Sequence, residues 1–395
     1  MKIYNKYFSL AVLTSCFLFY SCETVDLNQT ENPSTISQSL LDPVYAFNYA
    51  QFNLPDFVDS TNSFTQRVTR QMAMTGGNTY DNAFQPVNFN NNFSTAYSIL
   101  NAIKLLEPKA IQNNEFHLLG AAKIIRCYIL ATLADVYGDV PMSEALYGND
   151  NLFPKYDKSA EVYKQVLAEI DSAIILLSSS TNNTGSLAKD LYYPNPKGKI
   201  TNSSWITLAK TLKLKMFNNA RLAGSDIGKN ITSEINTIIS GGDYIDKPSE
   251  DFAYKYGTSR NTPNTRHPLY NDQYELGGGA YIANYMFWTM TLEKNVLNPI
   301  NNTYTSTIDP RTDFYFFKQD NLGTIPDAFV LPGRSRPEHY NQPSLVSFYE
   351  PTVRIPYTVS NWTGGAIPTG GFWGRDHGNN NGIPQDTDKR SVAGM

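Results

Sequence analysis

Two carboxylates beside a turn have the residue types and the spacing of a catalytic pair. Asp135 and Asp139 are separated by V-Y-G, and two carboxylates at one site can act as general acid and base in glycoside hydrolysis. The same positions suit structural roles. Gly138 and Pro141 are residues that end helices, and carboxylates near helix ends serve as caps and ion-pair partners. We therefore expect both residues to be structural, and we expect no catalysis.

A second cluster of oxygen-bearing residues surrounds the sequence G-N-N-N-G-I-P near residue 380. Asp and Asn oxygens suit Ca²⁺, which makes Asp376, Asp386 and Asp388 weak candidates for metal ligands. The EF-hand register fails, because counting back from Gly382 places His377 where the first Asp belongs. The zinc motifs C-x-x-C and H-E-x-x-H are absent. A loop of Asx turns explains the same residues, and we expect neither a resident metal nor a cofactor.

Aromatic rings among glycines are the residues best suited to contact a ligand. Such a ring can project without neighbours and stack on a sugar or a peptide, while nearby polar side chains add hydrogen bonds. Rings on helical stripes, such as Trp205 and Trp288, belong to the core instead. Filling the interior of the loops is the alternative role for each ring. The predicted ligand contacts are Asn78, Tyr80, Asp81, Asn361, Trp362, Phe372, Trp373 and Arg375.

The N-terminus has the three regions of an export signal. Lys2 and Lys6 precede an uncharged stretch, residues 10–20, which is too short to span a membrane. Ser21 and Cys22 follow, and the chain then becomes polar. This resembles the lipobox of bacterial lipoproteins, although two aromatic residues replace the usual aliphatic and small ones. It implies cleavage after residue 21 and acylation of Cys22. An ordinary secretory signal with a chance cysteine is the alternative.

The remaining cysteine and the charge limit the classes of function. Once residues 1–21 are removed and Cys22 carries lipid, Cys127 is the last free thiol, so no intramolecular disulfide can form. Cys127 lies in the apolar sequence I-I-R-C-Y-I-L, which favours a buried, inert thiol. Removal of Lys2 and Lys6 from 32 basic and 36 acidic residues leaves an acidic chain. Nucleic acid is therefore not expected as a partner.

These residues need a scaffold, and the apolar periodicity predicts a helical one. Pro108 should end the first long helix, Gly138 and Pro141 the second, and Asp157 or Ser159 should cap the third. The second is apolar on both sides, as in a layered helical array. The pattern predicts a short helix at about 65–74 and longer ones at about 93–107, 118–136, 159–177, 205–224 and 281–292.

This succession of helices predicts a mainly α fold, a tetratricopeptide-like helical-repeat scaffold with a loop-rich, irregular C-terminal half. We expect a signal peptide at residues 1–21, a lipidated tether at 22–53 and a single domain at 54–395. Within that domain the helical core should cover about 93–224, and the ligand-binding half about 225–395. Long loops on a rigid scaffold are where binding surfaces usually lie.

Three stretches, in this order, resemble the SusD/RagB family. They are Y-G-D-V-P-M-S-E-A-L (Tyr137–Leu146), W-I-T-L-A-K-T-L-K-L-K-M-F-N-N-A-R from Trp205, and D-P-R-T-D-F-Y-F (Asp309–Phe316). The resemblance implies a nutrient-binding lipoprotein of Bacteroidetes on the outer membrane, facing the exterior, that caps a SusC-like TonB-dependent transporter. It implies no cofactor and no catalysis. Proteins of this kind usually continue with another helical segment, so we expect the sequence to be truncated at Met395.

The expected function is therefore capture of oligosaccharides for transfer to that transporter. Binding of peptides or other nutrients in the same complex is the alternative. A surface glycan hydrolase and a purely structural or adhesive surface protein are further interpretations from other classes of function.

Overall fold

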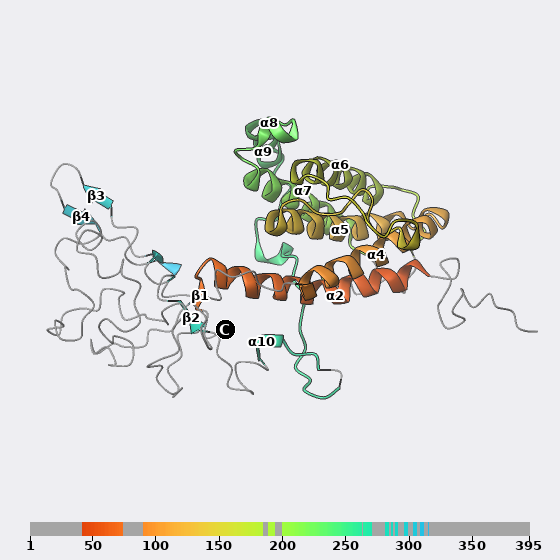
Figure 1. Cartoon of the computed structure of the whole chain (residues 1–395), viewed down its shortest axis with the longest axis horizontal. Coiled ribbons are helices and arrows are strands. Elements are labelled where there is room, and N and C mark those ends of the chain that lie inside the picture. Colours follow the sequence, from red (N-terminus) through yellow and green to blue (C-terminus); the bar gives the residue numbers. More distant parts are fainter. Residues whose placement is uncertain are drawn as a thin grey trace, which may run out of the picture.

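The computed structural model describes residues 42–73, 90–184, 189–193, 200–262 and 264–270, with short pieces between residues 281 and 315. Helices make up most of this part of the chain (Figure 1). This confirms the mainly α fold that the sequence predicts. The longer helices are α2 (Pro43–Val68), α4 (Asn90–Gln112), α5 (Phe116–Tyr137), α6 (Ser159–Leu177), α7 (Asn202–Asn219) and α9 (Ile231–Gly241).

Helix α2 begins at Pro43, and Asp42 caps a free backbone amide of its first turn. The Asp42 carboxylate accepts a hydrogen bond of 2.9 Å from the amide of Val44, and Pro43, which has no amide hydrogen, occupies the first turn. Phe47 and Ala50 are fully buried. Residues 43–53 therefore belong to helix α2, and the bound of residue 53 predicted for the tether is too far along the chain.

The C-terminal end of α2 also differs from the prediction. The short helix expected at about 65–74 is wrong, because α2 runs unbroken to Val68 and Met72–Ala73 forms strand β1. The hydroxyls of Thr61 and Thr65 donate hydrogen bonds of 2.7 and 2.9 Å to carbonyls one turn earlier. These polar residues fit within the helix although they interrupt its apolar periodicity. The interruption hid the helix from the sequence pattern.

Helix α4 continues through Pro108, which was predicted to end it. Pro108 lies four residues before the last residue of α4, Gln112. A proline near a helix end removes a single helical hydrogen bond. Leu106 and Ala110 are fully buried on either side of it. Burial of these apolar side chains outweighs the lost bond, so the helix gains one further turn.

Helix α5 is the centre of the core. It packs against α2, α4, α6 and α7, which confirms the layered, tetratricopeptide-like arrangement expected for a helix that is apolar on both sides. Among the described helices it alone has the length and composition to cross a membrane, but most of it is buried inside the fold. Its burial identifies it as a core helix. It ends at Gly138, as predicted, where φ is +80°.

Helix α6 takes its N-terminal hydrogen bond from the preceding turn. The cap position is Lys158, whose side chain makes no capping bond. Instead the Asp139 carboxylate accepts a hydrogen bond of 3.0 Å from the amide of Ser159 and pairs with Lys158 at 2.7 Å. The predicted caps were therefore wrong. The Asp157 carboxylate instead accepts the amides of the turn after α5, and the amide of Ser159 donates to the capping carboxylate.

Trp205 of α7 is fully buried, which confirms its prediction as a core residue. Its indole Nε1 donates a 2.8 Å hydrogen bond to Asp190, and the same carboxylate accepts the amides of Tyr192 and Tyr193. The ring of Phe252 lies edge-on to Trp205, with 5.4 Å between centroids. This cluster fastens two irregular segments to the helical layer.

Helical structure extends past the predicted core boundary at about residue 224. Helices α8 (Gly224–Ile227) and α9 come directly after α7, and the short α10 (Pro268–Tyr270) lies further on, so the region from 225 is less irregular at its start than expected. The helix predicted at 281–292 is contradicted at its start, because Tyr281–Ile282 forms strand β2. This strand pairs antiparallel with β1. Strands β3 (Val296–Asn298) and β4 (Thr303–Thr305) form a second antiparallel pair.

Candidate functional site

The described residues do not include the predicted ligand contacts, the lipidation site or the weak metal candidates. The roles assigned to them stay predictions. What the structure describes instead is the turn Y-G-D-V-P, a loop with exposed rings and an apolar pocket. The residues outside the described part are Cys22, Asn78, Tyr80, Asp81, Asn361, Trp362, Phe372, Trp373, Arg375, Asp376, Asp386 and Asp388.

The turn after α5 is held by the carboxylate of Asp157. Its Oδ2 accepts hydrogen bonds from the amides of Met142 at 2.9 Å and Ser143 at 2.7 Å, and its Oδ1 accepts the Ser143 hydroxyl at 2.7 Å. Burial acts to raise the pKa of Asp157, but the hydrogen bonds from Ser143 and Met142 outweigh it, so the pKa is lowered. Asp157 is therefore a charged clamp on the backbone.

The two carboxylates with catalytic spacing are both engaged in structural contacts. Asp135 accepts hydrogen bonds from the Tyr163 hydroxyl and, at 2.8 Å, from the side-chain amide of Asn219. The hydrogen bond from Lys158 lowers the pKa of Asp139. These contacts join α5 and its turn to α6 and α7, which agrees with the predicted structural roles. Within the described ranges, no three His, Cys, Asp or Glu side chains are placed to hold a metal ion.

The loop that follows the turn presents rings to solvent on a fixed backbone. Phe153 is 91% exposed and Tyr156 is 63% exposed. The ammonium of Lys104 lies 3.3 Å from the ring centroid of Tyr147. The Asn151 side chain accepts the amide of Phe153 at 3.2 Å. These rings are separate from the predicted ligand contacts, and no geometry in the described part of the chain assigns them a ligand.

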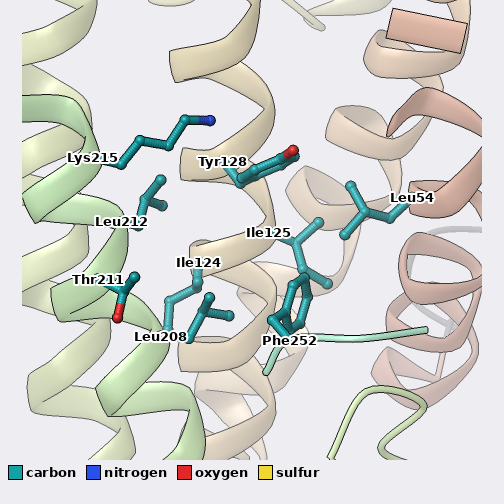
Figure 2. A pocket seen from close by; sticks show the side chains of 9 residues that line it. All are labelled: Leu54, Ile124, Ile125, Tyr128, Leu208, Thr211, Leu212, Lys215 and Phe252. Atoms are coloured by element: carbon teal, nitrogen blue, oxygen red, sulfur yellow. The ribbon is translucent and has the colours of Figure 1, made fainter. Parts of the chain in front are cut away.

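An apolar pocket of about 110 Å³ lies between α2, α5 and α7. Figure 2 shows its side chains converging from the three helices and from an irregular segment after α9. Most of the lining is hydrocarbon, and the ammonium of Lys215 is its one charged group. The lining residues are Leu54, Ile124, Ile125, Tyr128, Leu208, Thr211, Leu212, Lys215 and Phe252.

The chemistry of this pocket does not suit a sugar. The Lys215 ammonium lies 5.0 Å from the ring centroid of Tyr128, and burial raises the pKa of Tyr128, so the phenol is neutral. The Thr211 hydroxyl already donates to the carbonyl of Thr207 at 2.8 Å and accepts the amide of Ile245 at 2.8 Å. Sugar hydroxyls would lie against hydrocarbon and lose their hydrogen bonds. The pocket instead fits a small apolar group.

Sequence reasoning did not identify this pocket. Tyr128 and Lys215 belong to different helices, and the packing of α5 against α7 brings them together. The sequence shows that α5 has a second apolar face. Such a face predicts that another element packs against it but does not say which element.

Cys127 is buried and free, which confirms the prediction of an inert thiol. Its Sγ lies 3.7 Å from the carbonyl oxygen of Val166. Burial raises the pKa of the thiol well above its ordinary value, and a protonated thiol is a poor nucleophile.

Comparison with solved structures shows the same fold. A SusD homologue from Parabacteroides distasonis shares 20% identity with a TM-score of 0.52, over 69% of this chain and 56% of that one. A chitin-binding SusD homologue from Flavobacterium johnsoniae shares 15% identity with a TM-score of 0.50, over 63% and 51%. The chain spans about half the length of these solved relatives. No curated protein matches the sequence.

The sequence itself identifies the family. The SusD-like family, described as starch-binding and associating with the outer membrane, matches residues 28–330. The match includes all of the described helices and most of the chain. This chain therefore belongs to the SusD-like family of outer-membrane-associated binding proteins.

Proposed function

We propose that this protein captures oligosaccharides at the outer membrane and passes them to a SusC-like TonB-dependent transporter. The observation that carries the proposal is the family match over residues 28–330, because the family is described as starch-binding and outer-membrane-associated. The chitin-binding homologue from Flavobacterium johnsoniae has the same helical fold and supports a glycan as the ligand class. Such a role needs recognition and release rather than bond cleavage.

The sugar contacts in this proposal are the eight loop residues predicted from the sequence. Rings supply apolar faces for the sugars, and the amide, carboxylate and guanidinium groups pair with hydroxyls. The described pocket between α2, α5 and α7 has no part in sugar binding, since its lining is apolar. The assigned contacts are Asn78, Tyr80, Asp81, Asn361, Trp362, Phe372, Trp373 and Arg375.

The proposal also includes a lipid anchor on Cys22. Removal of residues 1–21 leaves Cys22 as the first residue, and two or more acyl chains give stable membrane attachment. The first helix in the described part of the chain begins at Pro43. An extended linker of about 20 residues spans at most roughly 70 Å. Such a linker allows the domain to approach and leave a transporter without leaving the membrane.

Sugar binding is tested by calorimetry on the full-length protein in detergent, with soluble starch and chitohexaose as probes. We expect at least one probe to bind, and we expect the double variant Trp362→Ala/Trp373→Ala to weaken that binding about tenfold or more, because both ring faces are removed. Phe153→Ala removes an exposed ring outside the assigned contacts and should leave the affinity unchanged. The absence of binding to both probes would reject the proposal, and sugar release during the titration would indicate an enzyme.

Transfer to a transporter is tested separately in the native host. A tagged copy should co-purify with a TonB-dependent transporter from detergent-solubilised outer membranes. Deletion of the gene should slow growth on the glycan that binds in vitro and leave growth on its monosaccharide unchanged. Normal growth of the deletion strain on that glycan, together with the absence of a transporter in the purification, would contradict the delivery step.

A further inference from the structure

Helix α2 carries a row of exposed aromatic rings on the face that points away from the core. Tyr45, Tyr49 and Phe52 are 67%, 45% and 62% exposed. Their spacing of four and three residues places them on one face of the helix, over about 10 Å of its axis. We call these three residues the α2 ridge. Large apolar groups clustered on a surface mark a binding site more often than scattered ones do.

The α2 ridge is mounted on a rigid support. Gln51, next to Phe52, is fully buried. Its side chain donates a 2.7 Å hydrogen bond to the carbonyl of Lys189 and accepts the amide of Leu191 at 3.0 Å. The hydroxyl of Tyr192 donates to the carbonyl of Gln51 at 3.0 Å. A fixed backbone and side chains with two torsions lose little conformational entropy on binding.

The size of the α2 ridge favours a small ligand over a protein. An aromatic side chain can bury 150–250 Å², so three rings exposed by about half offer roughly 350 Å². A stable protein interface buries about 800 Å² on each partner. The ridge falls well short of that area, but it is large enough to cover one side of a short run of sugar rings.

The charges around the α2 ridge favour a neutral ligand. No Lys or Arg occurs from Pro43 to Gln66, and Asp42 and Asp56 are exposed at the two ends of the ridge. Burial raises the pKa of Tyr256, and the charges of Asp59 and Asp56 raise it further, which places a neutral phenol near the Asp56 end. Carboxylates disfavour anionic lipid headgroups and phosphates. They also accept hydrogen bonds from hydroxyls beside the rings.

We propose that the α2 ridge is a second glycan-binding site, at which Tyr45, Tyr49 and Phe52 stack on neutral sugar rings while Asp42 and Asp56 accept hydrogen bonds from hydroxyls. The inference rests on the proposed function and adds a site made of residues other than the eight loop contacts. Two sites on one chain bind a long polysaccharide more tightly than a short oligosaccharide, because the second contact is intramolecular.

The test compares the triple variant Tyr45→Ala/Tyr49→Ala/Phe52→Ala with wild type, as full-length protein in detergent. With soluble starch and glycol chitin as long-chain probes, we expect the affinity for the probe that binds wild type to fall about tenfold, by loss of stacking and of the second contact. The matched control Phe153→Ala/Tyr156→Ala removes rings of similar exposure on another surface. It should bind like wild type.

Each other outcome overturns the inference in an identifiable way. Unchanged affinity of the triple variant, with wild type binding normally, rejects the α2 ridge and leaves the proposed function intact. No binding by wild type rejects both. A fall of several degrees in Tm would show that the chain itself covers the ridge, since exposed positions tolerate such changes. Loss of a dimer in the variant would assign the ridge to a second copy.

Discussion

Three carboxylates in the described part of the protein hold the backbone in place, and two of them, Asp157 and Asp190, are buried. Asp139, Asp157 and Asp190 each accept at least one main-chain amide of a turn or a helix start. An amide deprived of water needs such an acceptor, and a charged acceptor makes a stronger bond than a neutral one. The acidic residues that first suggest a hydrolase therefore explain how irregular segments stay fixed between helices.

Loss of the Asp157 carboxylate should destabilise the fold. In Asp157→Ala the amides of Met142 and Ser143 lose their acceptor, and we expect a decrease of about 2–3 kcal/mol in the free energy of unfolding. Urea denaturation followed by circular dichroism measures it. The control Asp150→Ala changes an exposed carboxylate in the same loop and should stay within about 0.5 kcal/mol of wild type. Equal effects of the two substitutions would contradict the role of Asp157.

The same carboxylate gives stability a predictable pH dependence. Its pKa is lowered in the folded state, so the unfolded chain binds the proton more tightly and stability falls as the pH falls below about 4. The variant Asp157→Asn cannot titrate. The difference in unfolding free energy between wild type and this variant should therefore be largest near neutral pH and shrink as the pH falls. A constant difference between pH 7 and pH 3 would exclude the linkage.

At the scale of helices, the sequence predicted those elements whose apolar stripe is continuous. The stripes of α5 and α6 led to both helices with nearly correct bounds, and Trp205 was correctly placed in the core. Helix α2 was missed because the polar residues Thr61 and Thr65, whose hydroxyls bond to its own backbone, interrupt its apolar stripe. The end of α4 was misplaced because burial outweighs the effect of Pro108. Hydrogen bonds within the helix accommodate the polar residues of α2, and tertiary burial accommodates Pro108 in α4; apolar periodicity reports neither effect.

The end of α5 depends on a glycine. Gly138 has φ +80° and ψ −114°, a conformation open mainly to glycine, and a Cβ added at this residue would meet no neighbouring atom within 4 Å. Gly138→Ala should therefore cost about 1–3 kcal/mol through backbone strain alone. Gly241→Ala is the matched control, because Gly241 lies in α9 without a positive φ and also has open space. It should leave stability unchanged or raise it by up to about 1 kcal/mol. Thermal unfolding of both variants provides the comparison.

At the scale of the whole molecule, some features follow from the linear sequence and others arise only when the helices pack together. The helical layer and its family could be read from periodicity and from the order of three motifs, because both are properties of the linear chain. The apolar pocket could not be predicted, because Tyr128 and Lys215 meet only through the packing of α5 and α7. The α2 ridge could have been predicted from helical periodicity. Its three rings lie on the side of α2 opposite the buried Phe47 and Leu54. It was missed because α2 itself was not recognised.

Attachment of the whole protein to a membrane should depend on Cys22 alone. Acylation at this residue supplies the only anchor in the proposal, since the apolar helix α5 is buried within the fold. Cys22→Ala should therefore shift the protein from the membrane fraction to the soluble fraction and abolish labelling by a palmitate analogue. Cys16→Ala is the matched control, because Cys16 lies in the segment that is cleaved away, and its variant should stay membrane-bound and labelled. A Cys22→Ala protein that remains in the membrane fraction would mean that another surface of the molecule holds it there.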